Sequence, residues 1–239
     1  MTAAPDPFAF ASVADAYERG RPEYPGGVLD VLRPVGTVLD LAAGTGKLTR
    51  LLRTTAARVI AVEPLAELRA YLQADEILEG RAEAIPVPDA SVDLVTVGDA
   101  WHWFDHARAA AELARVTKPG GRVALLWQAP DAERRPAWTH RLAALLEPLR
   151  GDHPGFREDQ GRGPLAGHPS FDELRQHSVP FVWRPSHERY VDYIGSTSFV
   201  AGLSAHERRR LLAQVAEVVP AGTLTVPFAT TCWLTRRTS

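Results

Sequence analysis

A short segment with two glycines is the first candidate for chemistry. Residues 38–48 read VLDLAAGTGKL, an apolar run that ends in a turn containing Gly44 and Gly46. Glycine accepts positive backbone angles and leaves no side chain in the way of a ligand. Free amides at the start of the following helix favour polar or anionic ligand groups. The segment therefore predicts a buried strand, a ligand-binding turn and a helix.

Two common phosphate-binding motifs do not fit this turn. A P-loop needs a glycine where Leu41 stands and a hydroxyl where Leu48 stands. The dinucleotide motif needs a third glycine where Thr49 stands. The turn therefore favours a nucleoside ligand that carries no phosphate.

Two acidic residues lie beside the predicted turn. Asp40 comes just before it, where an acid would repel a diphosphate but can pair with an ammonium group, directly or through water. Glu63 ends the next apolar run, RVIAVE, 17 residues after Gly46. An acid at that place can accept hydrogen bonds from both ribose hydroxyls. A ligand with a ribose, an ammonium group and no phosphate is S-adenosylmethionine.

Alternating apolar strands and helices are expected to position these residues. Apolar runs at 37–41, 58–63, 92–97 and 122–127 are separated by helical patterns, which predicts a parallel sheet covered on both faces. A turn is expected at 118–121, a short helix at 171–176, and an antiparallel edge from strands at 179–183 and 224–234. We expect one domain over 1–239, with a cofactor-binding core at about 27–128. A cap is expected from 1–25 and about 130–200, and a C-terminal edge strand at about 224–235.

Composition excludes several classes of protein. The 239 residues carry a net charge of −2, which argues against a general binder of nucleic acid or anionic membranes. One cysteine excludes an internal disulfide and a multi-cysteine zinc site. The scattered histidines show no metal-ligand spacing, so we expect no metal. Without a signal-like or membrane-spanning segment, we expect a cytoplasmic monomer or homodimer.

Five segments in order resemble the class I S-adenosylmethionine-dependent methyltransferases. VLDLAAGTGKLT and VIAVEP resemble the family's first two motifs. GRAEAIPVPD at 80–89 resembles the segment that places adenine, and the stretches at 92–97 and 116–121 resemble the fourth strand and the entry to the fifth. The resemblance covers about half of the chain. It implies a doubly wound, mostly parallel seven-stranded sheet of the Rossmann-like methyltransferase type, with an antiparallel edge strand and a helical cap.

A narrower resemblance concerns the N-terminal arm and residues 100–105. The arm from Phe10 to Pro25 resembles that of the methyltransferase type 11 group. The stretch AWHWFD at 100–105 resembles the group's trans-aconitate methyltransferase-like branch. That branch uses small-molecule substrates, including carboxylic acids. By this resemblance, Tyr17 and Arg21 approach the methionine carboxylate. The full set of expected cofactor-binding residues is Tyr17, Arg21, Asp40, Ala42, Gly44, Gly46, Glu63, Pro64, Ala82, Glu83, Asp99 and Ala100.

Aromatic residues and one histidine are candidates for the substrate side. Trp101, Trp103 and Phe104 are expected to line the substrate pocket, and His102 lies between the two tryptophans. His102 is either a substrate contact or general base, or simply part of a packed aromatic cluster. Further candidates for an aromatic pocket are Trp138, Phe156, Tyr193 and Phe199.

The sequence thus predicts methyl transfer from S-adenosylmethionine to an O, N, S or C nucleophile of a small organic molecule. Two alternatives stay open. One is a cofactor-binding lyase, cyclase or regulator on the same fold. The other is an RNA or protein methyltransferase, against which the net acidity and the absence of a basic, aromatic stripe count.

Overall fold

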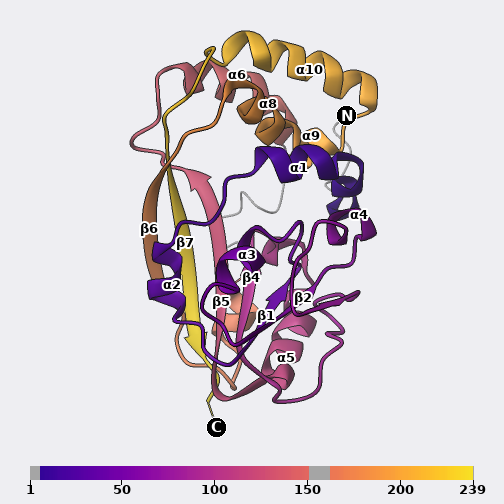
Figure 1. Cartoon of the computed structure of the whole chain (residues 1–239), viewed down its shortest axis with the longest axis vertical. Coiled ribbons are helices and arrows are strands. Elements are labelled where there is room, and N and C mark those ends of the chain that lie inside the picture. Colours follow the sequence, from indigo (N-terminus) through magenta and orange to yellow (C-terminus); the bar gives the residue numbers. More distant parts are fainter. Residues whose placement is uncertain (1–5, 151–161, 239) are drawn as a thin grey trace. The chain divides into compact units, whose positions relative to one another are not determined.

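A computed structural model describes residues 6–150 and 162–238 and shows one seven-stranded sheet with the order β3-β2-β1-β4-β5-β7-β6. Figure 1 shows the course of the chain through its strands and helices. The strands are β1 (Thr37–Leu41), β2 (Arg58–Val62), β3 (Glu76–Leu78), β4 (Val92–Gly98), β5 (Thr117–Pro130), β6 (Arg175–Trp183) and β7 (Val226–Arg236). The expected seven-stranded, mostly parallel sheet is confirmed.

The central strands run parallel, and their carboxyl ends lie level. Leu41 at the end of β1 pairs with Val62 of β2 on one side and with Val97 of β4 on the other. The chain places β2 and β3 on one side of β1, and β4 and β5 on the other. Ligands of open parallel sheets bind beyond the carboxyl ends of the strands where the strand order reverses in this way.

The last two strands form the expected antiparallel edge, but β7 lies between β5 and β6, so the expectation that the C-terminal strand is itself the edge strand is wrong. Near the start of β5, the Gly120 amide donates to the carbonyl of Arg237, just beyond the end of β7, at 3.0 Å, and the Arg237 amide donates back to the Gly121 carbonyl at 2.8 Å. Beyond the other end of β5, the Asp131 amide donates to the Pro227 carbonyl of β7 at 2.9 Å. The two strands therefore run in opposite directions.

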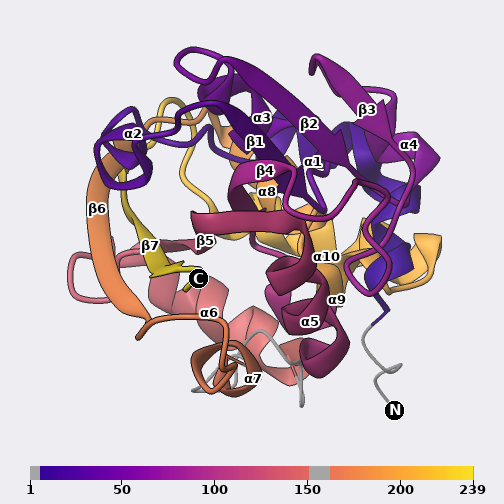
Figure 2. The same ribbon diagram turned by 90° about the horizontal axis from the view of Figure 1, so that it is seen from below.

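The chain divides into two compact units, which are described separately. The unit with the parallel strands comprises 23–128, 162–179 and 230–238 of the described residues. Its helices are α2 (Gly27–Leu32), α3 (Lys47–Leu52), α4 (Ala66–Arg69), η2 (Trp101–Trp103), α5 (His106–Val116) and α7 (Gly163–Ala166). Alternate side chains of β1 enter different apolar clusters, because Leu39 and Leu41 pack with α5 whereas Val38 packs with α2 and α3. Figure 2 shows α3 and α5 on opposite sides of these strands.

The second unit comprises 6–22, 129–150 and 180–229 of the described residues. Its helices are η1 (Pro7–Val13), α1 (Ala14–Gly20), α6 (Trp138–Arg150), α8 (His187–Gly195), α9 (Ser198–Ala201) and α10 (Ala205–Val218). The helix α1 approaches α8 closely, because a Cβ on Gly20 would lie 2.4 Å from the backbone nitrogen of Tyr193. The apolar side chains of this unit form one cluster that includes Trp183, Tyr193 and Phe228.

Two further local predictions are wrong. The helix expected at 171–176 is absent, because Phe171 forms a bridge with Arg237 and β6 already begins at Arg175. The turn expected at 118–121 lies inside β5, where Gly120 takes a positive φ of 75° and the pairing with β4 shifts register. The short helices α7 and α9 were not expected, since four residues are too few to show a helical period. Within the part of the chain that the structure describes, no helix is long and apolar enough to cross a membrane.

Candidate functional site

The turn after β1 takes the backbone conformation that its glycines predict. The φ angles are 55° at Ala42, 59° at Gly44 and 89° at Gly46. The turn is tied to the neighbouring strand, because the Ala43 amide donates to the carbonyl of Val62 at 3.0 Å. A Cβ on Gly46 would lie 3.0 Å from Leu72, so a larger residue would strain both backbone and packing there. The left-handed conformation of Ala42 costs about 1–2 kcal/mol, because its Cβ crowds the following carbonyl.

Glu63 follows β2 and lies against the same turn. Its side chain is 4% exposed; Oε2 accepts a hydrogen bond from the Gly44 amide at 2.9 Å, and Oε1 accepts one from the Leu65 amide at 3.0 Å. Burial raises the pKa of Glu63, and the two amide hydrogen bonds oppose that change. A carboxylate has about four acceptor positions, so two amides leave capacity for hydroxyl donors. The geometry fits a group that accepts from the two hydroxyls of a ribose.

A buried hydroxyl lies between the two glycines. Thr45 is fully buried, and its Oγ1 has no hydrogen-bond partner among the residues that the structure describes. Buried polar atoms almost always have a partner, and an exception calls for a missing ligand or water. The conformation of the turn and the acceptor capacity of Glu63 are the features that fit a polar nucleoside ligand. The sequence did not single out Thr45, because a threonine within a turn is ordinary.

Asp40 is held inside the protein by two threonines. It is 1% exposed; its Oδ2 accepts from the Thr49 hydroxyl at 2.6 Å, and its Oδ1 accepts from the Thr96 hydroxyl at 2.9 Å. Burial raises the pKa of Asp40 to about 6; the hydrogen bonds from Thr49 and Thr96 oppose this, and the charge of Glu63 adds to it. Both oxygens are therefore already engaged by the protein. The expected contact with a ligand ammonium group, direct or through water, stays a prediction.

The segment expected to receive adenine follows β3. Ala82 is buried in the apolar cluster that contains Trp101, whereas Glu83 is half-buried. The Glu83 carboxylate accepts a hydrogen bond from the Asp105 amide at 2.9 Å, at the start of α5. Gly80 is required by close packing, because a Cβ there would lie 2.6 Å from Pro86.

Asp99 and Ala100 lie where β4 ends. Asp99 has a positive φ of 52°, which a non-glycine residue adopts only when its surroundings hold it. Its Oδ2 accepts from the Tyr24 hydroxyl at 3.2 Å, and its Oδ1 accepts from the Gln128 amide at 3.0 Å. Tyr24 lies directly against Gly98, where a Cβ would meet its hydroxyl at 2.5 Å. The ends of β4 and β5 and the segment before α2 are thus joined through one carboxylate.

The aromatic residues after β4 divide into two kinds. Trp101 is completely buried, with its ring stacked on His106 at 5.3 Å and edge-on to Phe104 at 5.7 Å. In this conformation Trp101 belongs to the core, which does not favour the expected direct contact with a substrate. His102, Trp103 and Phe104 are half-buried, and the His102 ring lies 5.0 Å from that of Trp103. Those three stay candidates for the substrate side.

Tyr17 and Arg21 belong to the second unit. The Arg21 guanidinium donates to the Ser196 hydroxyl at 3.0 Å and to the Ser196 carbonyl at 2.9 Å, and it lies 5.0 Å from the Tyr17 ring centroid. Their assignment to the methionine carboxylate stays a prediction. Trp138, Tyr193 and Phe199 are in the same unit, and Phe156 lies outside the described residues. Across residues 6–150 and 162–238, no cluster of His, Cys, Asp and Glu could hold a metal ion.

Comparisons with known proteins agree with this arrangement. The family described as "Methyltransferase domain" matches residues 39–125, the stretch from β1 into β5. An uncharacterized methyltransferase of Mycobacterium tuberculosis is 37% identical over 237 residues, which covers 94% of this chain and 93% of the relative. A malonyl-[acyl-carrier protein] O-methyltransferase of Enterobacter lignolyticus is 32% identical over 187 residues, or 74% of this chain and 72% of the relative.

A solved structure has the same fold. A protein of Anaeromyxobacter dehalogenans assigned to the type II methyltransferases superimposes with a TM-score of 0.68 at 28% identity. The match covers 90% of this chain and 97% of the other.

Proposed function

The chain belongs to the class I S-adenosylmethionine-dependent methyltransferases, and we propose that it methylates an O, N, S or C nucleophile of a small organic molecule. The buried Glu63 beside the Gly44–Gly46 turn is the observation that carries the cofactor part of this proposal. Its carboxylate has acceptor capacity left after binding two backbone amides. That capacity matches the two hydroxyls of a ribose.

The cofactor would be held at the carboxyl ends of β1, β2 and β4. Glu63 would accept the ribose hydroxyls, and the turn from Ala42 to Gly46 would lie against the rest of the ligand. The Ala82 amide is assigned to the adenine ring, and Glu83 lies beside it in the same loop with its carboxylate on the Asp105 amide. Pro64, Asp99 and Ala100 are also assigned to the cofactor site. The bound cofactor supplies an electrophilic methyl group on a sulfonium.

The protein's part in such a reaction is to position the acceptor and exclude water. A nucleophile must lie in line with the carbon–sulfur bond, and holding it there removes most of the entropic barrier. Trp103 and Phe104 are proposed to form an apolar wall for the acceptor. An acceptor that is already a carboxylate needs no base, and the name of the Enterobacter relative describes O-methylation of a malonyl group. Small carboxylic acids are therefore the first substrate class to test.

His102 is proposed to contact the acceptor and, for a hydroxyl or amine substrate, to take its proton. An imidazole can take a proton from a hydroxyl or amine as it attacks. With a hydroxyl or amine acceptor, the His102→Gln variant should therefore lose most of kcat. With a carboxylate acceptor, which has no proton to remove, the variant should keep most of kcat.

Calorimetric binding of S-adenosylhomocysteine tests the cofactor assignment. Each hydrogen bond to a charged acceptor contributes about 1.5–3 kcal/mol, so Glu63→Ala should raise Kd by about tenfold or more. Glu67→Ala is the matched control, because Glu67 lies four residues later on the exposed side of α4. Unchanged affinity in a folded Glu63→Ala protein would refute the ribose assignment.

A screen of acceptors tests the substrate class. Incubation with metabolite extracts should give products heavier by about 14 Da, the mass of the added methylene, with release of S-adenosylhomocysteine. Methyl transfer to RNA or protein, with no small-molecule product, would overturn the proposed substrate class.

A further inference from the structure

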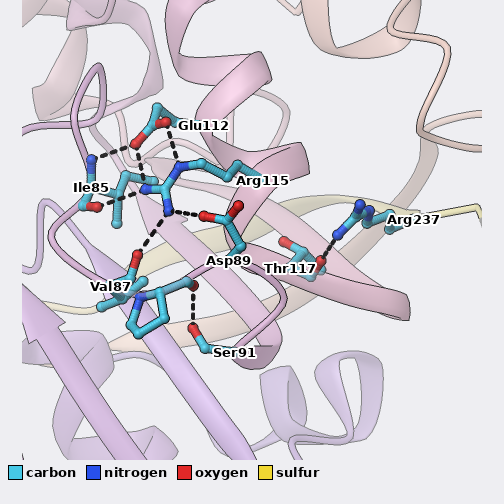
Figure 3. Close-up of polar contacts among 9 residues, drawn as sticks. Ile85, Val87, Asp89, Ser91, Glu112, Arg115, Thr117 and Arg237 are labelled. Atoms are coloured by element: carbon cyan, nitrogen blue, oxygen red, sulfur yellow. Dashed lines mark hydrogen bonds and ion pairs between the residues drawn. The ribbon is translucent and has the colours of Figure 1, made fainter.

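The loop from residue 81 to residue 89, here named the 81–89 loop, is fixed to α5 by one arginine. Arg115, in the last turn of α5, donates to the Ile85 carbonyl at 2.8 Å and to the Val87 carbonyl at 2.9 Å. It also donates to the Asp89 carboxylate at 2.7 Å. Figure 3 shows the guanidinium lying among these three acceptors. Two of the three are backbone carbonyls, so the arginine fixes the path of the loop and not merely one side chain.

Glu112 holds this arginine and also binds the loop itself. Its Oε1 accepts from Arg115 Nε at 2.7 Å, and its Oε2 accepts from the guanidinium at 2.8 Å, a bidentate pair one turn apart on α5. The same Oε2 accepts from the Ile85 amide at 2.7 Å. The hydrogen bond from Arg115 is the main cause of the lowered pKa of Glu112, which keeps this carboxylate charged. Both backbone groups of Ile85 are thereby bound by the helix.

A second attachment lies at the other end of α5. Glu83 accepts from the amide of Asp105, and Asp105 in turn caps the helix by accepting from the Arg108 amide at 3.2 Å. Asp105 directly follows Phe104, one of the residues proposed for the substrate side. The two attachments are ten residues apart on the helix, or about 15 Å at 1.5 Å per residue. The loop is therefore held across nearly the full length of α5.

We propose that Arg115, Glu112 and Glu83 are positioning residues that keep the 81–89 loop in the conformation that receives the adenine ring. This inference rests on the proposed function, because it assumes that the loop receives the cofactor. The loop's own backbone contributes the Ala84–Arg81 and Val87–Ile85 hydrogen bonds. All other polar contacts of the loop described above are made with residues of α5 or with its N-cap, Asp105.

The expected effect on affinity follows from the population of the loop conformation. A protein that is competent to bind only a fraction f of the time has an apparent Kd raised by 1/f. If loss of Arg115 leaves the loop in place about a tenth of the time, Kd for the cofactor rises about tenfold. The charges and groups proposed to touch the ribose and the methionine tail stay unchanged, since Arg115 contacts none of them.

Two measurements on the full-length protein test this inference without a known substrate. Hydrogen exchange of the ligand-free protein should show faster exchange at the Ile85 amide and its loop neighbours in Arg115→Met, while the amides of β1 and β4 keep their protection. Calorimetry with S-adenosylhomocysteine should show the tenfold rise in Kd. Arg108→Met is the matched control, because Arg108 lies on the same helix with its side chain exposed.

A second pair of variants separates positioning from general loss of structure. Glu83→Ala removes the acceptor for the Asp105 amide, whereas Glu83→Gln keeps an oxygen at the same place. We expect Glu83→Ala to weaken cofactor binding and Glu83→Gln to restore most of it. Equal losses in both, or faster exchange of the loop with unchanged affinity, would overturn the inference. Wild-type protein that fails to bind S-adenosylhomocysteine would instead overturn the proposed function, and slow exchange of the loop in Arg115→Met would overturn the attachment alone.

Discussion

Asp40→Asn is expected to make the protein more stable at neutral pH, although it removes a residue at the centre of the candidate site. Asp40 is buried, and its pKa rises from 3.8 to about 6 on folding. The folded protein therefore binds this proton more tightly than the unfolded chain does. Stability from this group is greatest at low pH and is lost as pH rises between about 4 and 6.

The magnitude follows from the size of the shift. One pKa unit corresponds to about 1.4 kcal/mol, so the change from 3.8 to about 6 costs the wild type about 3 kcal/mol once Asp40 is ionised. About 1.4 kcal/mol of that cost arises between pH 5 and pH 8. An asparagine has no charge to bury. Its oxygen can accept from one threonine hydroxyl, while its amide donates to the other.

Urea unfolding of wild type and variant at pH 5 and pH 8 measures this effect. The difference in unfolding free energy should favour Asp40→Asn more at pH 8 than at pH 5, by about 1–1.5 kcal/mol. Asp30→Asn, the same substitution on the exposed side of α2, should change stability little at either pH. A variant that loses the same stability at both pH values would show that the threonine hydrogen bonds outweigh the burial of charge, and the reasoning would fail.

Three other changes test separate parts of the structure. Ala42→Gly should raise the free energy of unfolding by up to about 1 kcal/mol, seen as a higher urea midpoint, because glycine relieves the left-handed strain at φ 55°. A lower midpoint would show that Ala42 is not strained. Trp101→Ala should lower the free energy of unfolding by about 3–5 kcal/mol, measured by calorimetric melting. Trp103→Ala should leave the melting temperature nearly unchanged and should instead lower substrate turnover. Similar losses of melting temperature in both variants would contradict their different burial. The thiol of Cys232, whose pKa burial raises to about 12, should resist iodoacetamide in the native protein and react only in urea, and rapid native labelling would disprove its enclosure.

The sheet was predictable because its signal is local. The runs at 37–41, 58–62 and 92–98 are short and mostly apolar at consecutive positions, which is typical of strands in a parallel sheet covered on both faces. Gly44, Gly46 and Glu63 could also be placed, since the ends of adjacent parallel strands meet at one edge. The start of the edge strand β6 was not predictable, because RQHS at 175–178 is polar and gains its strand conformation from pairing with another part of the chain.

Contacts between residues far apart in the chain could not be predicted from the sequence. The partners of Asp40 are Thr49 on the next helix and Thr96 on a strand 56 residues later, and neither spacing is a motif. The attachment of Arg115 to Ile85 and Val87 also joins residues about 30 positions apart. Nor does the composition distinguish Trp101 from Trp103, although one is in the core and the other is half-buried. The burial of each ring depends on the side of η2 from which it projects.

The attachment of one loop to both ends of one helix has a consequence for evolution. A helix gains 1.5 Å with each residue, and an inserted residue also turns the later side chains by about 100°. Inserting or deleting a residue between Asp105 and Glu112 would therefore separate Glu112 and Arg115 from Ile85 unless the loop changed length as well. Across related proteins, the number of residues in this loop and in this helix should therefore vary together.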